Sequence, residues 1–237
     1  MLNASDGQRG NRTYGLGMST DNTRSAATGE TGRASVMRET LLLTAERLFA
    51  ERGIEAVSLR EIASAAGNGN NNAVQYHFGS KEGLVHAIFE FRVLQMDGPR
   101  RGMLALAKQD GTADDLQTLM RMILLPHLDL ADETGRHPHA ALQIEYLTRW
   151  RPQGMMHPAD EDIAASDTLR FIMSGILAKL DHLPVEIATT RLGLAQLMFA
   201  NLLVLMDHET GPVRDSRDLR IRDTVHLATS LLLAPLH

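Results

Sequence analysis

Residues 38–84 read RETLLLTAERLFAERGIEAVSLREIASAAGNGNNNAVQYHFGSKEGL, and they contain a dense series of helix signals. Apolar residues recur there every three or four positions from Leu41 onward, which predicts an amphipathic helix that starts near residue 35 and ends at Gly53. Ser58 and Glu61 have the spacing of a capping box, in which the hydroxyl accepts from the Glu61 N–H and the carboxylate reaches back. A second, short helix is therefore predicted directly after Ser58.

Two more helices are predicted after a polar run of asparagines. Val74 and Phe78 lie one helical turn apart in a third, short helix, and Ser80 is a cap for a longer fourth one. Small residues such as Ala63 would let the two short helices approach closely. This order of helices around a turn is typical of a helix-turn-helix unit, which we predict over residues 35–82.

The outward face of the third helix is polar, and this makes it a candidate for DNA contact. Asn and Gln side chains pair with adenine in the major groove, and an alanine methyl can meet a thymine methyl. Hydroxyl, imidazole and ammonium groups near helix N-termini suit phosphates. The predicted DNA-binding residues are Ser58, Arg60, Asn70, Asn71, Asn72, Ala73, Gln75, Tyr76, His77 and Lys81. For the asparagine run, a solvated loop is the alternative.

The elements LF-x-E-x-G, S-x-x-E-I-A-x-x-A-G and Y-H-F-x-S-K-E-x-L follow one another between Leu48 and Leu84. In this order they resemble the DNA-binding domain of the TetR family of bacterial transcriptional regulators. The resemblance implies phosphate-contact roles for His77 and Lys81. It also implies a homodimeric repressor that a small molecule releases from a near-palindromic operator. An architectural DNA-binding protein without an effector and a helical metabolite-processing enzyme are the alternatives.

The remaining chain is predicted to be a tail and a helical domain. Residues 1–34 are polar and lack periodicity, so they are expected to be a disordered tail. Residues 83–237 show helical spacing throughout and no sustained two-residue alternation, so the fold class is all-α. By the resemblance, this second domain binds the effector and dimerises. Its helices are expected over 113–130, 138–151, 160–182, 184–208 and 218–233, with a kink at Pro126.

The last two predicted helices supply the expected dimer interface. Apolar residues surround most of the helix between Leu192 and Met206, and a helix that is apolar all round must be buried on more than one side. A symmetry mate is a natural cover for the second side, although two central helices of one monomer would show the same pattern. The predicted interface residues are Leu194, Leu197, Leu202, Leu205, Val225, Ala228 and Leu232.

Aromatic and methionine side chains of the middle helices are candidates for an apolar effector cavity with few polar groups, and so for an apolar ligand. Ordinary core or surface placement is the alternative for each of them. The candidates are Met120, Leu124, His127, Glu145, Tyr146, Trp150, Phe171, Met173, Met198 and Phe199.

Composition narrows the function classes. The chain has no cysteine, which excludes disulfide scaffolds, thiol catalysis and Cys-ligated zinc. His137 and His139 would point to different sides of a helix, so no metal or cofactor is expected. No catalytic spacing is found, so no enzyme is predicted. The apolar stretch of Leu192–Met206 is short for a membrane span and no signal peptide is read, so a cytoplasmic protein is expected.

Overall fold

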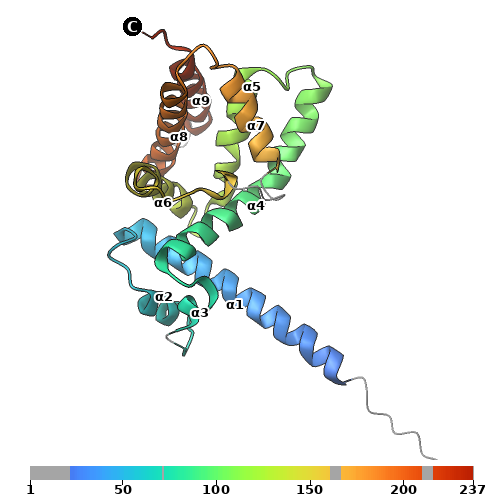
Figure 1. The fold of residues 1–237 in the computed structure, drawn as a ribbon, viewed down its shortest axis with the longest axis vertical. Coiled ribbons are helices and arrows are strands. Elements are labelled where there is room, and N and C mark those ends of the chain that lie inside the picture. The colour runs from blue at the N-terminus through green and yellow to red at the C-terminus, as the bar shows by residue number, and fades with distance from the viewer. Residues whose placement is uncertain (1–21, 71, 161–166, 210–215, 237) are drawn as a thin grey trace, which may run out of the picture. The chain divides into compact units, whose positions relative to one another are not determined.

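The computed structural model of the protein describes residues 22–70, 72–160, 167–209 and 216–236, with side chains described from residue 34 onward. Within these ranges every regular element is helical, as Figure 1 shows, and this confirms the predicted all-α fold. Residues 38–237 form one compact unit.

The predicted helix-turn-helix unit is present. It consists of α1 (Asn22–Arg52), α2 (Leu59–Ala65) and α3 (Ala73–Phe78), and α4 follows directly from Lys81. α1 begins at Asn22, before the predicted start, so the last part of the expected tail is helical; residues 1–21 lie outside the described residues. The buried side chains that hold α1, α2 and α3 together include Leu41, Leu42, Ala45, Phe49, Ile62, Ala63 and Val74.

Two serine caps set the starts of α2 and α4. Ser58 Oγ accepts from Glu61 N at 3.2 Å, and Ser80 Oγ accepts from Gly83 N at 3.0 Å, as predicted. The Glu61 carboxylate interacts with the Ser58 backbone N–H, the other half of the expected capping box. It also pairs with Arg52 at the end of α1, because the guanidinium offers it a charged donor. α2 is thus tied to α1 as well as capped.

The second domain continues along α4, which runs through Pro99 without ending. A kink was predicted at Pro126; there the structure changes from α-helix to 3-10 helix, because proline offers no N–H to the helix ladder. After α6 the chain widens into a π-helical turn, a feature that is frequent at functional sites. The elements are α4 (Lys81–Gln109), α5 (Leu116–Leu124), a 3-10 helix (Leu125–Leu130), α6 (Pro138–Glu145), the π turn (Tyr146–Trp150), short 3-10 helices (Arg151–Gln153 and Pro158–Asp160), α7 (Asp167–Ala178), α8 (Val185–Asp207) and α9 (Arg217–Leu233).

α8 and α9 pack along one another beside α5 and α7 (Figure 1). Three of the predicted dimer residues lie in this core: Val225, Ala228 and Leu232 are at most 3% exposed. Their assignment to the dimer interface is therefore wrong, since the protomer itself covers that side of α9. Of the predicted α8 residues, Leu194 and Leu205 are exposed, and Leu197 and Leu202 are half-buried.

α8 is long and apolar enough to cross a membrane by length and composition alone, and a third of its apolar window is buried inside the protein. A helix packed into the core of a water-soluble domain has the same properties. The length and composition of α8 therefore do not indicate a membrane span.

Candidate functional site

α3 turns its polar side to solvent and its apolar side to the core. Val74 is fully buried, whereas Asn72 and Gln75 are exposed, His77 is half-buried and Tyr76 is 84% exposed. The helix is thus held rigidly by its inner side while the outer side is free to approach a partner. This is the arrangement that insertion into a DNA groove requires.

The turn before α3 is braced by asparagine side chains. Asn68 Oδ1 accepts from Asn70 N at 2.9 Å, and Asn70 Oδ1 accepts from Asn72 N at 3.0 Å. Each bond is an Asx turn that satisfies a backbone donor locally. Asn71 lies outside the described residues. The predicted contact of Ala73 with a thymine methyl is not supported, because Ala73 is only 4% exposed and packs inward.

Two other predicted phosphate contacts are already bonded within the protein. The Ser58 hydroxyl is the α2 cap, although Ser58 is exposed. Lys81 is half-buried, and its Nζ donates to the carbonyl oxygens of Ile54 at 2.9 Å and Glu55 at 3.1 Å. The ammonium group therefore holds the loop after α1 in this conformation. Arg60 on α2 is exposed.

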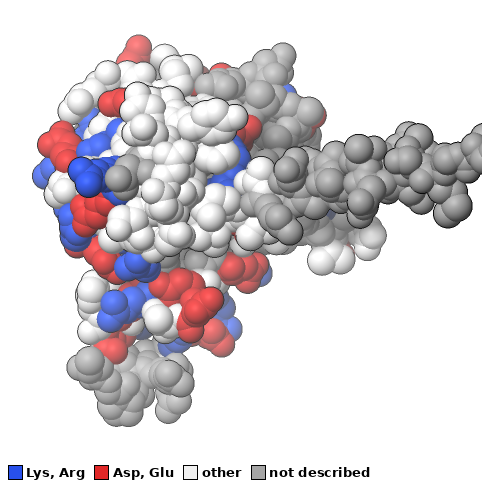
Figure 2. All heavy atoms as spheres, turned by 90° about the horizontal axis from the view of Figure 1, so that it is seen from below, with Lys and Arg blue, Asp and Glu red and all other residues white. Residues whose placement is uncertain are grey.

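On the face drawn in Figure 2, Lys and Arg are interspersed with Asp and Glu and form no single basic patch. This agrees with the sequence, in which residues 1–101 hold 12 basic and 11 acidic residues. Any recognition of a polyanion by this chain must therefore depend on a few well-placed groups rather than on a broad positive field.

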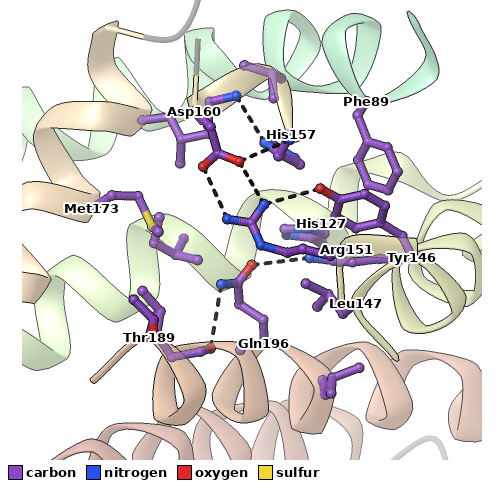
Figure 3. Close-up of a pocket in the computed structure, with 18 of the residues that line it drawn as sticks. Phe89, His127, Tyr146, Leu147, Arg151, His157, Asp160, Met173, Thr189 and Gln196 are labelled. Atoms are coloured by element: carbon purple, nitrogen blue, oxygen red, sulfur yellow. Dashed lines mark hydrogen bonds and ion pairs between the residues drawn. The ribbon is translucent and has the colours of Figure 1, made fainter. Parts of the chain in front are cut away.

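The second domain contains a cavity of about 580 Å³, a volume typical of small-molecule sites. Its walls come from α4, α5, α6, the π turn, α7 and α8, with further residues from the 3-10 helices (Figure 3). Much of the wall is apolar. The apolar lining residues include Phe89, Val93, Met96, Ile123, Leu147, Leu169, Met173, Leu177, Leu192 and Leu197.

A connected polar group lies on one side of this cavity, as Figure 3 shows. Arg151 forms a two-bond ion pair with Asp160, at 2.8 and 3.2 Å, and also donates to the Tyr146 hydroxyl at 3.1 Å. Tyr146 in turn donates to the Met155 carbonyl at 3.0 Å. Burial acts to raise the pKa of Asp160, but the bonds from Arg151 and from the His157 backbone lower it overall. The pair is therefore charged and internally neutralised at neutral pH.

Two cavity histidines are uncharged at neutral pH. Burial lowers the pKa of His127 to about 3, with further electrostatic lowering by its neighbours His139 and Arg100. Burial likewise lowers the pKa of His157 to about 3. His127 stacks against His139 with ring centroids 5.8 Å apart. These rings can thus offer hydrogen bonds to a bound molecule without adding charge.

Three of the ten predicted effector residues line the cavity: His127, Tyr146 and Met173. Three others are almost fully buried and lie in the hydrophobic core instead of lining the cavity: Met120, Leu124 and Phe199. Phe171 is 52% exposed and lies against Lys108. The others that do not line it are Glu145, Trp150 and Met198.

Several polar lining residues were missed from the sequence. One signal was available: Arg100 continues the row formed by Phe89, Val93 and Met96, which is one helical face interrupted by a cation. For the others no local pattern exists, because they meet only through the fold. The missed polar lining residues are Arg100, His139, Gln143, Arg151, His157, Asp160, Thr189, Thr190 and Gln196.

A buried ionic cluster joins the first domain to the cavity wall. Glu46 of α1 accepts from Arg92 Nε of α4 at 2.9 Å and is 2.9 Å from His139 Nδ1 of α6. All three side chains are at most 6% exposed. Burial acts to raise the pKa of Glu46, but the bonds to His139 and Arg92 lower it overall, so the carboxylate is charged. Because His139 also lines the cavity, this one side chain connects Glu46 of α1 to the cavity wall.

A second connection starts from Glu145 at the end of α6. Both of its carboxylate oxygens accept from the Ile54 N–H, at 3.1 and 3.0 Å. Gly53 stands in the left-handed region at φ 84°, and a Cβ there would lie 3.6 Å from that carboxylate. Glu145 thus fastens the loop after α1, the same loop that Lys81 holds, and it directly precedes the cavity residue Tyr146.

A clamped helix with a free polar face, preceded by a braced turn, defines a DNA-binding protein of the helix-turn-helix class. Residues 41–88 match the family model described as bacterial regulatory proteins, tetR family. The match covers the helix-turn-helix unit, so the first domain is similar to the DNA-binding domain of these transcriptional regulators.

Two solved structures are similar to this chain. One is described as a gamma-butyrolactone receptor (ArpA-like protein); it is 22% identical, with 82% of this chain and 98% of that chain covered and a TM-score of 0.46. The other is the fatty acid degradation regulator FadR from Bacillus halodurans; it is 18% identical, with 84% and 99% covered and a TM-score of 0.43. No curated protein matches the chain.

Proposed function

We propose that this regulator is a homodimeric, cytoplasmic repressor that a small-molecule effector releases from a near-palindromic operator, and that it has no enzymatic activity of its own. The observation that carries the proposal is the pair of connections between the cavity wall and the first domain. The Glu46–Arg92–His139 cluster and the bond from Ile54 N to Glu145 both reach α6, whose side chains and following turn face the cavity. A ligand that displaces α6 would therefore disturb α1 and the loop that leads to α2.

The DNA-contacting surface is assigned to the exposed side of α3 and the residues around it. Asn72 and Gln75 would contact base edges, whereas Tyr76, His77 and Arg60 would contact phosphates. Asn70, Asn71, Ser58 and Lys81 remain candidates at the rim, with Lys81 required to leave its carbonyl partners. In a dimer, two copies of α3 would enter successive major grooves about 34–36 Å apart.

The dimer face is assigned to the exposed leucines of the last two helices. On α8, Leu194 and Leu205 are 48% and 57% exposed and lie on one side of the helix. On α9, Leu219, Leu227 and Leu233 are 49–62% exposed. Apolar side chains exposed on two neighbouring helices are the kind of surface that a symmetry mate covers, giving a four-helix interface.

Equilibrium sedimentation of the full chain tests the dimer. The double variant L205E/L227E is expected to sediment as a monomer, because two carboxylates would have to be buried against their symmetry copies. Leu106 on α4, which is 61% exposed, serves as the matched control, and L106E should remain dimeric. A wild-type chain that sediments as a monomer at micromolar concentration would overturn the assignment.

Selection of duplexes bound by the full chain from a random pool tests the DNA function. The selected sequences are expected to contain two related half-sites, and binding should weaken steeply with added salt because phosphate contacts release counterions. Q75A should relax base preference, Y76A should weaken binding to every sequence, and Q109A at the exposed end of α4 should change neither. Recovery of no enriched sequence would refute the proposed role.

A further inference from the structure

Arg100 is a buried cation in the wall of the cavity. It lies on α4 in one row with Phe89, Val93 and Met96, at spacings of four, three and four residues, so the four side chains share one helical face. Arg100 is only 2% exposed. The row therefore ends in a guanidinium group placed where the helical pattern would otherwise put an apolar side chain.

The guanidinium group lacks suitable partners. Nε and Nη1 of Arg100 are buried without a hydrogen-bond partner among the described residues, and Nη2 meets only the Met96 sulfur, at 3.5 Å. Asp97, the carboxylate whose charge acts on Arg100, is bonded to Arg101 instead, at 3.1 Å. Burial lowers the pKa of Arg100 to about 10, so it is still charged at neutral pH. A buried, charged donor without an acceptor is energetically unfavourable. A bound molecule with a hydrogen-bond acceptor would remove this cost.

The other charges of the described cavity wall are already matched. Arg151 and Asp160 neutralise each other in a two-bond ion pair, and His139 shares its Nδ1 with the Glu46 carboxylate. Arg100 is thus the one cation of that wall, as far as the structure describes it, without a carboxylate partner. A ligand that matches the charge of this site would therefore place a single negative charge beside Arg100.

We propose that the effector is an apolar molecule that carries a single carboxylate, and that Arg100 binds this carboxylate inside the cavity. This inference rests on the proposed function, because it takes the cavity as the effector site. The planar guanidinium fork matches the two oxygens of a carboxylate. A phosphate monoester would bring a second charge, for which the described wall offers no second free cation. The apolar side chains around the rest of the cavity suit a hydrocarbon body.

Binding at Arg100 also suggests how the effector would act on the first domain. Arg92 lies eight residues earlier on α4, about two turns away, and holds Glu46 of α1. His139, whose Nδ1 contacts the same Glu46 oxygen as Arg92 Nε, lines the same cavity. A carboxylate that draws Arg100 into the cavity would therefore pull on the helix that carries one half of the buried cluster.

Isothermal titration calorimetry of the full chain without DNA tests the proposal. The probes are 4-phenylbutyrate, 6-phenylhexanoate and 8-phenyloctanoate, each compared with the alcohol of the same chain length. The best carboxylate is expected to bind at least about tenfold more tightly than its alcohol, since hydrogen bonds between charged groups are stronger than those to a neutral hydroxyl. R100M should remove this preference, R100K should keep part of it, and R101M, an exposed neighbour on the same helix, should leave it unchanged.

Thermal unfolding separates a ligand-binding arginine from a structural one. R100M is expected to melt at the same or a higher temperature than the wild type, because it removes a buried cation that has no partner. A lower melting temperature of R100M together with an unchanged carboxylate preference would overturn the proposal. Equal binding of acids and alcohols, or binding of neither, would also overturn it. Those results would leave operator selection, which uses no ligand, as the separate test of the regulatory function.

Discussion

The two domains are stabilised by different kinds of polar contact. In the first domain, the serine caps join residues three apart in the chain, Ser58 with Glu61 and Ser80 with Gly83. At the junction with the second domain, the buried polar contacts join residues 46 to 93 positions apart, such as Glu46 with Arg92 and with His139. The DNA-reading unit is therefore specified by local sequence, whereas the cavity and its connections depend on how distant helices meet.

The difference also concerns burial. The polar groups of α3 that are proposed to read DNA are exposed and exchange water for a partner at little cost. The polar groups around the cavity are buried, so each must be matched inside the protein or by a ligand. Long-range contacts in the second domain should accordingly matter more for stability than local contacts in the first. The four predictions below test this from the largest expected effect to the smallest.

Removing the centre of the buried cluster should have the largest effect. E46A leaves Arg92 charged and unpaired at 6% exposure, and it is expected to lower the free energy of unfolding by about 3–5 kcal/mol. Urea denaturation followed by circular dichroism measures this loss.

The double variant E46L/R92M is the control for that experiment. It replaces the ion pair by apolar side chains of similar volume and should recover part of the loss, because Arg92 no longer loses a carboxylate partner, although His139 Nδ1 still loses its contact with Glu46. If E46A unfolds within about 1 kcal/mol of the wild type, a buried long-range contact is no stronger here than a helix cap.

The junction bond should rank second. E145A leaves the Ile54 N–H buried and without an acceptor, and it is expected to lower the free energy of unfolding by about 1–3 kcal/mol. E145Q keeps one acceptor oxygen and should lose less. Because the bond also connects the cavity side to the loop before α2, E145A should weaken the response of DNA binding to the effector. Fluorescence anisotropy on a selected operator, with and without the best phenylalkanoate, measures that response.

The sequence predicted the end of α1 and the capped starts of α2 and α4, since caps, turn residues and helical spacing are local properties. It did not predict that α1 begins as early as Asn22. It failed where a residue's role depends on another helix. The pairing of Glu61 with Arg52 of α1 was not predicted, because it joins two helices. Val225 was expected at a dimer interface, but α9 buries that side within the protomer.

The cavity shows the same limit of local reasoning. Aromatic and methionine residues were its predicted lining, yet Met120 and Phe199 fill the core, and the polar wall is built from Arg151, Asp160 and Gln196. No spacing in the chain connects these three residues, because they come from separate elements that only the fold brings together. Arg100 is the exception, since its place in the apolar row of α4 was readable from the sequence.

The pH dependence of stability should come from the second domain. His127 has a pKa of about 3 when folded and about 6.5 in an unfolded chain, so the unfolded state binds more protons between these values. Stability is therefore expected to fall as the pH drops from about 6.5 towards 4, by up to about 1.4 kcal/mol per pH unit for this one group. H127Q should make this dependence less steep in urea titrations at stepped pH. H77Q, which changes a half-buried histidine of α3, is the control and should keep the wild-type pH dependence of the free energy of unfolding. If H77Q flattens this dependence and H127Q does not, the pH dependence comes from the first domain and not from the second.

The smallest effect should come from the local caps. S58A removes the acceptor for Glu61 N at the start of α2 and should lower the free energy of unfolding by about 1 kcal/mol, within the range found for N-caps. S80A at the start of α4 should cost a similar amount, since the geometry of the two caps is nearly the same. S64A changes an exposed serine inside α2 and is the control, expected to be neutral or slightly stabilising because alanine favours the helix interior.

The two caps should also differ in function. α2 is tied to α1 through Arg52, whereas α4 carries Arg92 and Arg100, so S80A should alter the effector response and S58A should alter only DNA affinity. An S58A loss as large as that of E46A would show that local and long-range contacts contribute equally.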